Sequence, residues 1–119
     1  MSATSPAFPA GPVVTVFRSW LRDGAGPEYE LLAGRMLALA RAMPGFVDFT
    51  TFVAEDGERV SLVTFADLAS HRAWREHPDH REAQRLGRER LYGSFDILVC
   101  TVLDERHFRT PDGRSPDAS

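Results

Sequence analysis

The chain has 119 residues, the length of a single domain with a core of its own. Apolar residues make up 43% of the chain and charged residues 26%, as in an ordinary soluble globular domain. The net charge of −3 comes from 14 basic and 17 acidic residues, spread without long blocks of one sign. We therefore expect neither a nucleic acid nor a membrane surface as a partner. All the basic residues are arginine, a composition typical of a GC-rich bacterial gene.

The cysteine content and the N-terminal stretch bear on cellular location. The single cysteine, Cys100, excludes an internal disulfide bond and a multi-cysteine metal site, and it fits a reducing compartment. Residues 1–11 lack the positive charge and the apolar stretch of a signal peptide, and no apolar run reaches transmembrane length. We expect a cytoplasmic protein, with Cys100 as a small core residue.

The two ends of the chain, residues 1–11 and 107–119, are rich in small and polar residues and in proline. They hold too few bulky apolar side chains to offset the entropy lost on ordering, so we expect flexible tails around one domain at 12–106. Within this domain the sequence predicts strands at 13–21, 46–54, 60–65 and 95–103, a helix after Pro27, and a helical region at 68–91 interrupted near Pro78.

The first helix and the hairpin have the clearest signals. Apolar residues follow Pro27 at spacings of 3, 4, 3 and 4, which is the periodicity of one helical face, and Pro44-Gly45 ends that helix. Asp56-Gly57 is a hairpin turn signal between two β-rich segments. The apolar residues of the helical stripe are Tyr29, Leu32, Met36, Leu39 and Met43.

The order β-α-β-β-α-β predicts an α+β, ferredoxin-like fold with a four-stranded antiparallel sheet and all helices on one face. A sheet with one solvated face should alternate apolar and polar residues along its strands. Here the strands at 46–54 and 95–103 are apolar on both faces. Because monomers rarely expose a large apolar patch, we expect the second face to be buried in a homodimer; partial cover by the tails is the alternative.

Residues 70–84 contain three of the four histidines and one of the two tryptophans. His80 precedes Ala83 by three positions and Gly87 by seven, so it shares the inward face of its helix, and Trp74 is expected to face the same space. A histidine in an apolar pocket can donate or accept a proton or bind a metal near neutral pH. The alternative is a core histidine that is hydrogen-bonded to a backbone carbonyl or to a helix end.

Other candidate groups give weaker signals. His77 and His80 offer only two metal ligands unless Glu76 or Asp79 joins them, and their spacing matches no known zinc site, so we expect no metal. The arginines of 81–90 alternate with glutamates, as on a solvated, self-paired helix face. Within that row Arg88 is a candidate for binding a phenolate, and Tyr92 for placing its hydroxyl at the pocket mouth. Arg18, in an apolar strand, indicates an edge or a polar cavity.

The stretch from Val13 to Leu103, about three quarters of the chain, resembles the antibiotic biosynthesis monooxygenase family of the dimeric α/β-barrel superfamily. The resemblance depends on residues 13–18, on Ala42-Met43-Pro44-Gly45-Phe46, on 70–74 and on His77-Pro78-Asp79-His80. The last of these is similar to the family's Pro-His-Phe signature displaced by one residue. The resemblance implies a homodimer with a cavity between sheet and helices in each subunit.

Several members of that family oxidise aromatic or quinol substrates with molecular oxygen, without metal or flavin. The resemblance thus implies a cofactor-independent monooxygenase or related oxidoreductase acting on a small aromatic or quinol-like compound. His80 would be the catalytic acid/base or orienting group, Trp74 an aromatic wall, and Arg88 and Tyr92 anchors for a phenolate. A non-catalytic small-molecule binding protein is an alternative.

A second branch of the superfamily degrades haem and carries an Asn on the first strand, a Trp on the second helical segment and an iron-ligating His ten residues after that Trp. Trp74 matches, but Gln84 stands at the position of the His and Phe17 at that of the Asn. Two of the three haem positions therefore differ. Haem binding stays an alternative, with His80, one helical turn before Gln84, as the iron ligand. We expect Phe17 and Gln84 to contact the substrate.

Overall fold

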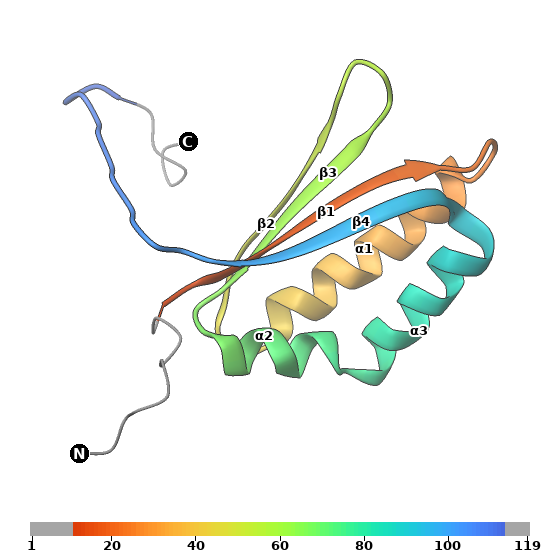
Figure 1. Cartoon of the computed structure of the whole chain (residues 1–119), viewed down its shortest axis with the longest axis horizontal. Helices are drawn as coiled ribbons and strands as arrows, with labels where there is room; N and C mark the ends of the chain where they lie inside the picture. The colour runs from red at the N-terminus through yellow and green to blue at the C-terminus, as the bar shows by residue number, and fades with distance from the viewer. Residues whose placement is uncertain (1–10, 114–119) are drawn as a thin grey trace.

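The computed structural model describes residues 11–113 and consists of a four-stranded sheet with helices packed on it (Figure 1). In chain order the elements are β1 (Val13–Leu21), α1 (Gly26–Ala42), β2 (Phe46–Val53), β3 (Arg59–Phe65), α2 (Leu68–Arg75), α3 (Pro78–Leu86), the π-helical turn η1 (Gly87–Leu91) and β4 (Tyr92–Thr101).

The strands stand in the order β2-β3-β1-β4, each antiparallel to its neighbours. All helices lie on one face of this sheet, as Figure 1 shows. The register pairs Val16 of β1 with Leu62 of β3 and with Leu98 of β4, so these three side chains share the face away from the helices. The predicted α+β, ferredoxin-like arrangement is confirmed.

The predicted element boundaries agree with the structure except around the last strand. β4 begins at Tyr92, three residues before the predicted start, and ends at Thr101. The predicted helical region is divided into α2, α3 and η1, and its first break falls at Pro78, which opens α3. No helix within 11–113 is long and apolar enough to cross a membrane.

The expected tails fall only partly within the structure. Residues 1–10 and 114–119 lie outside the described residues, so the expectation of flexibility there stays a prediction. Residues 107–113 are exposed and belong to no helix or strand. In Figure 1 the chain after β4 runs away from the sheet.

The core consists of two clusters on the helix side of the sheet. One contains buried Leu32 of α1, Ala83 of α3 and Leu91 of η1. The other contains Val63 and Phe65 of β3 together with Trp74 of α2. Between the two clusters a cavity remains over the helix-side face of the sheet.

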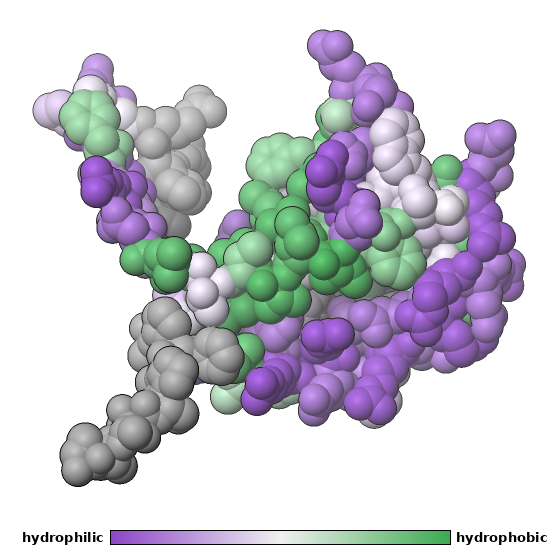
Figure 2. Space-filling model, viewed as in Figure 1, coloured by the Kyte–Doolittle hydropathy of each residue, from purple (hydrophilic) through white to green (hydrophobic). Residues whose placement is uncertain are grey.

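The opposite face of the sheet is exposed in the single chain. Phe52 is 56% exposed and Leu98 is 58% exposed, although both are large apolar residues. Figure 2 shows hydrophobic surface gathered over the strands, whereas the helices are mostly hydrophilic outside. The prediction that Cys100 is a core residue is wrong for the single chain: it pairs with Val14 in the register, shares this outer face and is exposed.

The turn between α1 and β2 depends on Gly45, which has a φ of +82°. Its carbonyl oxygen accepts a hydrogen bond from the Ala66 backbone N–H at 2.7 Å, which ties the turn to the start of α2. A Cβ added at this position would overlap the side chain of Ser70. Glycine is therefore required here both for the backbone conformation and for space.

We expect Gly45→Ala to lower the free energy of unfolding by about 3 kcal/mol or more, because a positive φ costs about 1–2 kcal/mol and the overlap adds to it. The matched control is Gly24→Ala: Gly24 has a φ of +79° but open space around it, so only the backbone cost applies. Urea denaturation at one protein concentration measures both. Equal losses in the two variants would show that the overlap with Ser70 is relieved at no cost.

Candidate active site

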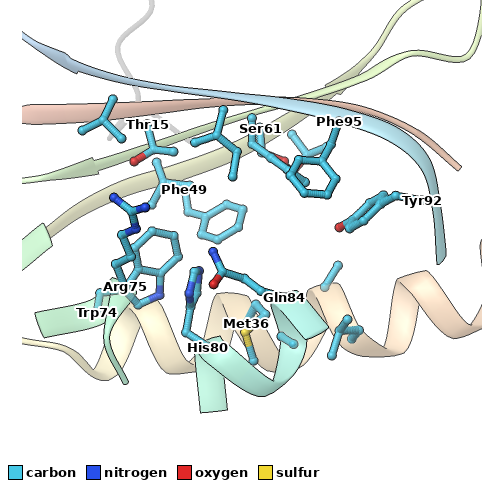
Figure 3. A pocket seen from close by; sticks show the side chains of 18 of the residues that line it. Thr15, Met36, Phe49, Ser61, Trp74, Arg75, His80, Gln84, Tyr92 and Phe95 are labelled. Carbon is cyan, nitrogen blue, oxygen red and sulfur yellow. The ribbon is translucent and has the colours of Figure 1, made fainter. Parts of the chain in front are cut away.

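A cavity of about 150 Å³ lies between the helix-side face of the sheet and the helices α1, α2 and α3 (Figure 3). Thr15, Thr51 and Ser61 are small residues in the middle of β1, β2 and β3, and they form its floor. Bulky aromatic rings stand at its ends. Its other lining residues include Phe17, Tyr29, Met36, Phe49, His71, Trp74, Arg75, His80, Gln84, Arg88, Tyr92 and Phe95.

The structure brings the six predicted site residues together around this one cavity. Trp74 comes from α2, and Arg88 comes from η1. The other four come from β1, α3 and β4: Phe17, His80, Gln84 and Tyr92. Their placement agrees with the expectation, and their individual roles stay predictions.

His80 and Trp74 are in direct contact at one wall. Their ring centroids lie 4.3 Å apart, with the planes inclined by 56°. Trp74 is also packed on Phe65 of the sheet, at 5.2 Å between ring centroids. The Nδ1 atom of His80 and the Nε1 atom of Trp74 are both buried and make no hydrogen bond of good geometry. Buried polar atoms without a partner are rare, and a catalytic role is one explanation for them.

Burial lowers the pKa of His80 from 6.5 to about 4. The Arg75 backbone opposes this shift, and the positive charge of the Arg75 side chain adds to it. The imidazole is therefore neutral at physiological pH, with one ring nitrogen able to accept a hydrogen bond or a proton. The contact with the Arg75 backbone keeps open the alternative of a core histidine that is hydrogen-bonded to a backbone carbonyl.

A second histidine, His71, lines the cavity and was not predicted as a site residue. It is 3% exposed, and its Nδ1 atom lies 3.4 Å from the Thr15 hydroxyl oxygen. Burial lowers its pKa, and the charges of Arg75 and Arg72 lower it further. Its position three residues before Trp74, on the same helix face, is the signal in the sequence that would have identified it.

The other end of the cavity is an aromatic cluster. The Tyr92 ring lies 5.3 Å from Phe17 and 5.7 Å from Phe95, centroid to centroid, in edge-to-face contacts. Figure 3 shows the Tyr92 hydroxyl pointing into the cavity. Burial raises the pKa of this hydroxyl, so Tyr92 is a neutral hydrogen-bond donor at physiological pH.

The backbone around Tyr92 is held by Arg22, at the end of β1. The Arg22 guanidinium donates hydrogen bonds to the carbonyl oxygens of Tyr92, at 3.0 Å, and Arg88, at 2.8 Å. Gly87 leaves the space that the Tyr92 ring fills, since a Cβ there would overlap the ring. The π-helical turn η1 begins at the same residue, and such turns often occur at functional sites.

The arginines of the last helical segment divide into two groups. Arg85 pairs with Glu82 and Glu89, as a self-paired face predicts. Arg90 pairs with Glu28 of α1. Arg88 lines the cavity and forms no side-chain ion pair with the described residues. Arg18 points to the outer face, where it makes a two-bonded pair with Glu58 at 2.8 and 3.0 Å; it does not reach the cavity.

The described residues around the cavity form no metal site of three ligands, and no group of three metal-ligating side chains occurs elsewhere in the described part of the chain. His77 is the N-cap of α3 and accepts a hydrogen bond from the Asp79 backbone N–H, so its Nδ1 atom is already occupied. A haem-binding role of His80 stays an alternative.

The lowered pKa of His80 predicts an acid dependence of stability. The unfolded chain takes up a proton near pH 6.5 and the folded one only near pH 4, so stability falls as the pH decreases between these values. We expect wild type to lose about 3 kcal/mol more than His80→Gln across this window. Denaturation at several pH values measures the difference, and an NMR titration of the His80 ring gives its pKa directly. Parallel pH profiles for the two proteins would contradict the prediction.

Comparisons with known proteins give the family. The family model described as antibiotic biosynthesis monooxygenase matches residues 12–86, more than half of the chain. An uncharacterized protein of Bacillus subtilis, YqjZ, is 28% identical over 101 residues, covering 85% of this chain and 89% of that protein.

Solved structures share the fold. Rv0793 of Mycobacterium tuberculosis superimposes with a TM-score of 0.72 at 23% identity, covering 81% of this chain and 99% of that one. SnoaB of Streptomyces nogalater, described as a cofactor-independent oxygenase, superimposes with a TM-score of 0.69 at 23% identity, covering 81% of this chain and 97% of that one. With the family match over 12–86, the chain belongs to the antibiotic biosynthesis monooxygenase family.

Proposed function

We propose that the protein is a cofactor-independent monooxygenase that acts on a small, electron-rich phenol or quinol. One observation carries this proposal: an aromatic-walled cavity contains a neutral, buried imidazole with a free nitrogen, His80, packed on Trp74. The description of SnoaB as a cofactor-independent oxygenase supports the same reaction class and the expectation that no cofactor is needed.

The chemistry follows from the substrate. A phenolate is electron-rich enough to reduce molecular oxygen by itself, so the protein has to bind, deprotonate and exclude water. Oxygen adds to the ring carbon para to the phenolate, and loss of water from the hydroperoxide leaves a quinone. One oxygen atom enters the product, the other leaves as water, and the substrate supplies the electrons for both.

The residues around the cavity have distinct roles in this proposal. His80 accepts the phenolic proton, and the imidazolium and phenolate then attract each other strongly in the apolar cavity. Trp74 and Phe17 hold the aromatic ring between them. The Tyr92 hydroxyl, the Gln84 amide and the Arg88 guanidinium are donors for the substrate oxygens, and Figure 3 shows the Gln84 side chain directed into the cavity.

We further propose a homodimer, in the cytoplasm, in which two outer sheet faces pack on each other to form a barrel. The exposed apolar side chains on those faces support this, because an uncovered patch of that kind is rare on a monomer. The one cysteine in the sequence supports a reducing compartment.

We expect His80→Ala to lower the rate of oxygen uptake with 1,5-dihydroxynaphthalene at least about 100-fold, since a general base typically contributes 10²–10⁴. An oxygen electrode and product analysis for hydroxynaphthoquinone measure this, above the rate without protein. His107→Ala is the control, because this histidine is exposed near the C-terminus. Equal rates in wild type and His80→Ala would exclude the role of His80. Binding without turnover in wild type would indicate a non-catalytic binding protein.

We expect Leu98→Lys to raise the dimer dissociation constant at least about tenfold, because the two-fold axis brings two buried charges into one apolar interface. Leu31→Lys is the matched control: Leu31 is 68% exposed on α1, away from the sheet, against 58% for Leu98. Sedimentation equilibrium measures both variants. A wild-type protein that is monomeric at all concentrations would contradict the dimer.

A further inference from the structure

A second hollow lies at the corner between α2 and α3. Arg72 and Arg75 of α2, Glu76, and Arg81 and Gln84 of α3 line it. Arg75 and Gln84 line the main cavity as well, so these two side chains border both spaces. In Figure 3 the Arg75 side chain runs beside the Trp74 indole toward the sheet, with its guanidinium at the end of the cavity.

Several arginines of the domain are paired with a carboxylate, whereas the three around this hollow are not. Arg18, Arg59, Arg85 and Arg90 each have a carboxylate partner. Arg72, Arg75 and Arg81 have none within residues 11–113. Glu76 is the single carboxylate among the lining residues, so three positive charges against one negative leave the hollow at +2.

Helix stability alone does not explain this cluster. Arg72 and Arg75 lie in the last turn of α2, where positive charge is favourable. Arg81 is the fourth residue of α3, near the N-terminal end, where the helix dipole disfavours positive charge. The charges also act on the cavity: Arg75 lowers the pKa of both His71 and His80.

We propose that the ligand of the cavity is an aromatic compound bearing an anionic group of the carboxylate class, with the ring beside Trp74 and the anion on Arg75. Arg72 and Arg81 attract the anion to the hollow, and Arg75, which borders both spaces, holds it. Guanidinium and carboxylate groups pair through charge-assisted hydrogen bonds that fix orientation. The aromatic nature of the ligand rests on the proposed function, and the inference adds that this ligand carries a negative charge.

A small anion fits this place better than a nucleic acid or an acidic protein. The positive charge is confined to one hollow of a chain with a net charge of −3, whereas a nucleic-acid surface needs an extended basic stripe. The hollow also borders an apolar cavity, which a polymer backbone would not occupy. An amphiphilic small molecule satisfies both surfaces at once.

The test compares 1-naphthoate with its neutral analogue 1-naphthylmethanol by isothermal titration calorimetry on the full chain. We expect wild type to bind the carboxylate about tenfold more tightly than the alcohol. In Arg75→Gln this preference should disappear, so that carboxylate and alcohol bind about equally. Raising NaCl from about 0.05 M to about 0.5 M should reduce the preference in wild type, since salt screens partly exposed charges.

Two variants serve as controls. Arg85→Gln removes an arginine already paired with Glu82 and Glu89, so it should keep the full preference. Arg75→Lys retains the positive charge and should keep part of the preference for the carboxylate. This variant therefore separates loss of charge from loss of folding. Circular dichroism checks the fold of each variant.

The possible results separate the two proposals. If the alcohol binds as tightly as the carboxylate in wild type, the anion inference is wrong and the proposed function stands. If Arg75→Gln keeps the preference, Arg75 does not hold the anion and the inference fails. If neither compound binds, the cavity is not an aromatic site, and the proposed function fails together with the inference.

Discussion

The packing of Trp74 between the sheet and the last helices holds this domain together at its functional end. The indole lies 5.2 Å from Phe65 of β3 and 4.3 Å from His80 of α3, measured between ring centroids. One side chain of α2 thus joins α2 and α3 to the sheet and also forms a cavity wall. The same contact excludes water from the His80 imidazole and so lowers its pKa. Structure and proposed chemistry therefore depend on one aromatic residue.

The cavity exists because of residue size along the strands. Thr15, Ser61 and Thr51 occupy the middle of the helix-facing surface, where most sheets place large aliphatic residues. The Thr51 and Ser61 hydroxyls lie 2.8 Å apart and satisfy each other. Aromatic rings on both sides keep the helices away from this floor, so the space stays open.

The sequence predicts the fold well because its signals are local. The 3.6-residue stripe after Pro27, the Pro44-Gly45 stop and the Asp56-Gly57 turn each act within a few residues. His80 and Trp74 could be assigned to one space by helical spacing. Arg75 could not, since whether an arginine is paired depends on where distant carboxylates lie. The early start of β4 follows from η1 and from Arg22, a contact across 66 residues with Arg88 that no local pattern contains.

The prediction that Cys100 is a core residue was wrong for a related reason. A strand with two apolar faces can be buried on both, and the helices of a single chain cover only one of them. On β1, Thr15 and Phe17 point to the cavity while Val16 and Arg18 point to the outer face. The floor of the proposed active site is therefore also the surface of the proposed dimer. Arg18 on that surface is already paired with Glu58. Burying an ion pair in a dimer interface costs less free energy than burying an unpaired charge.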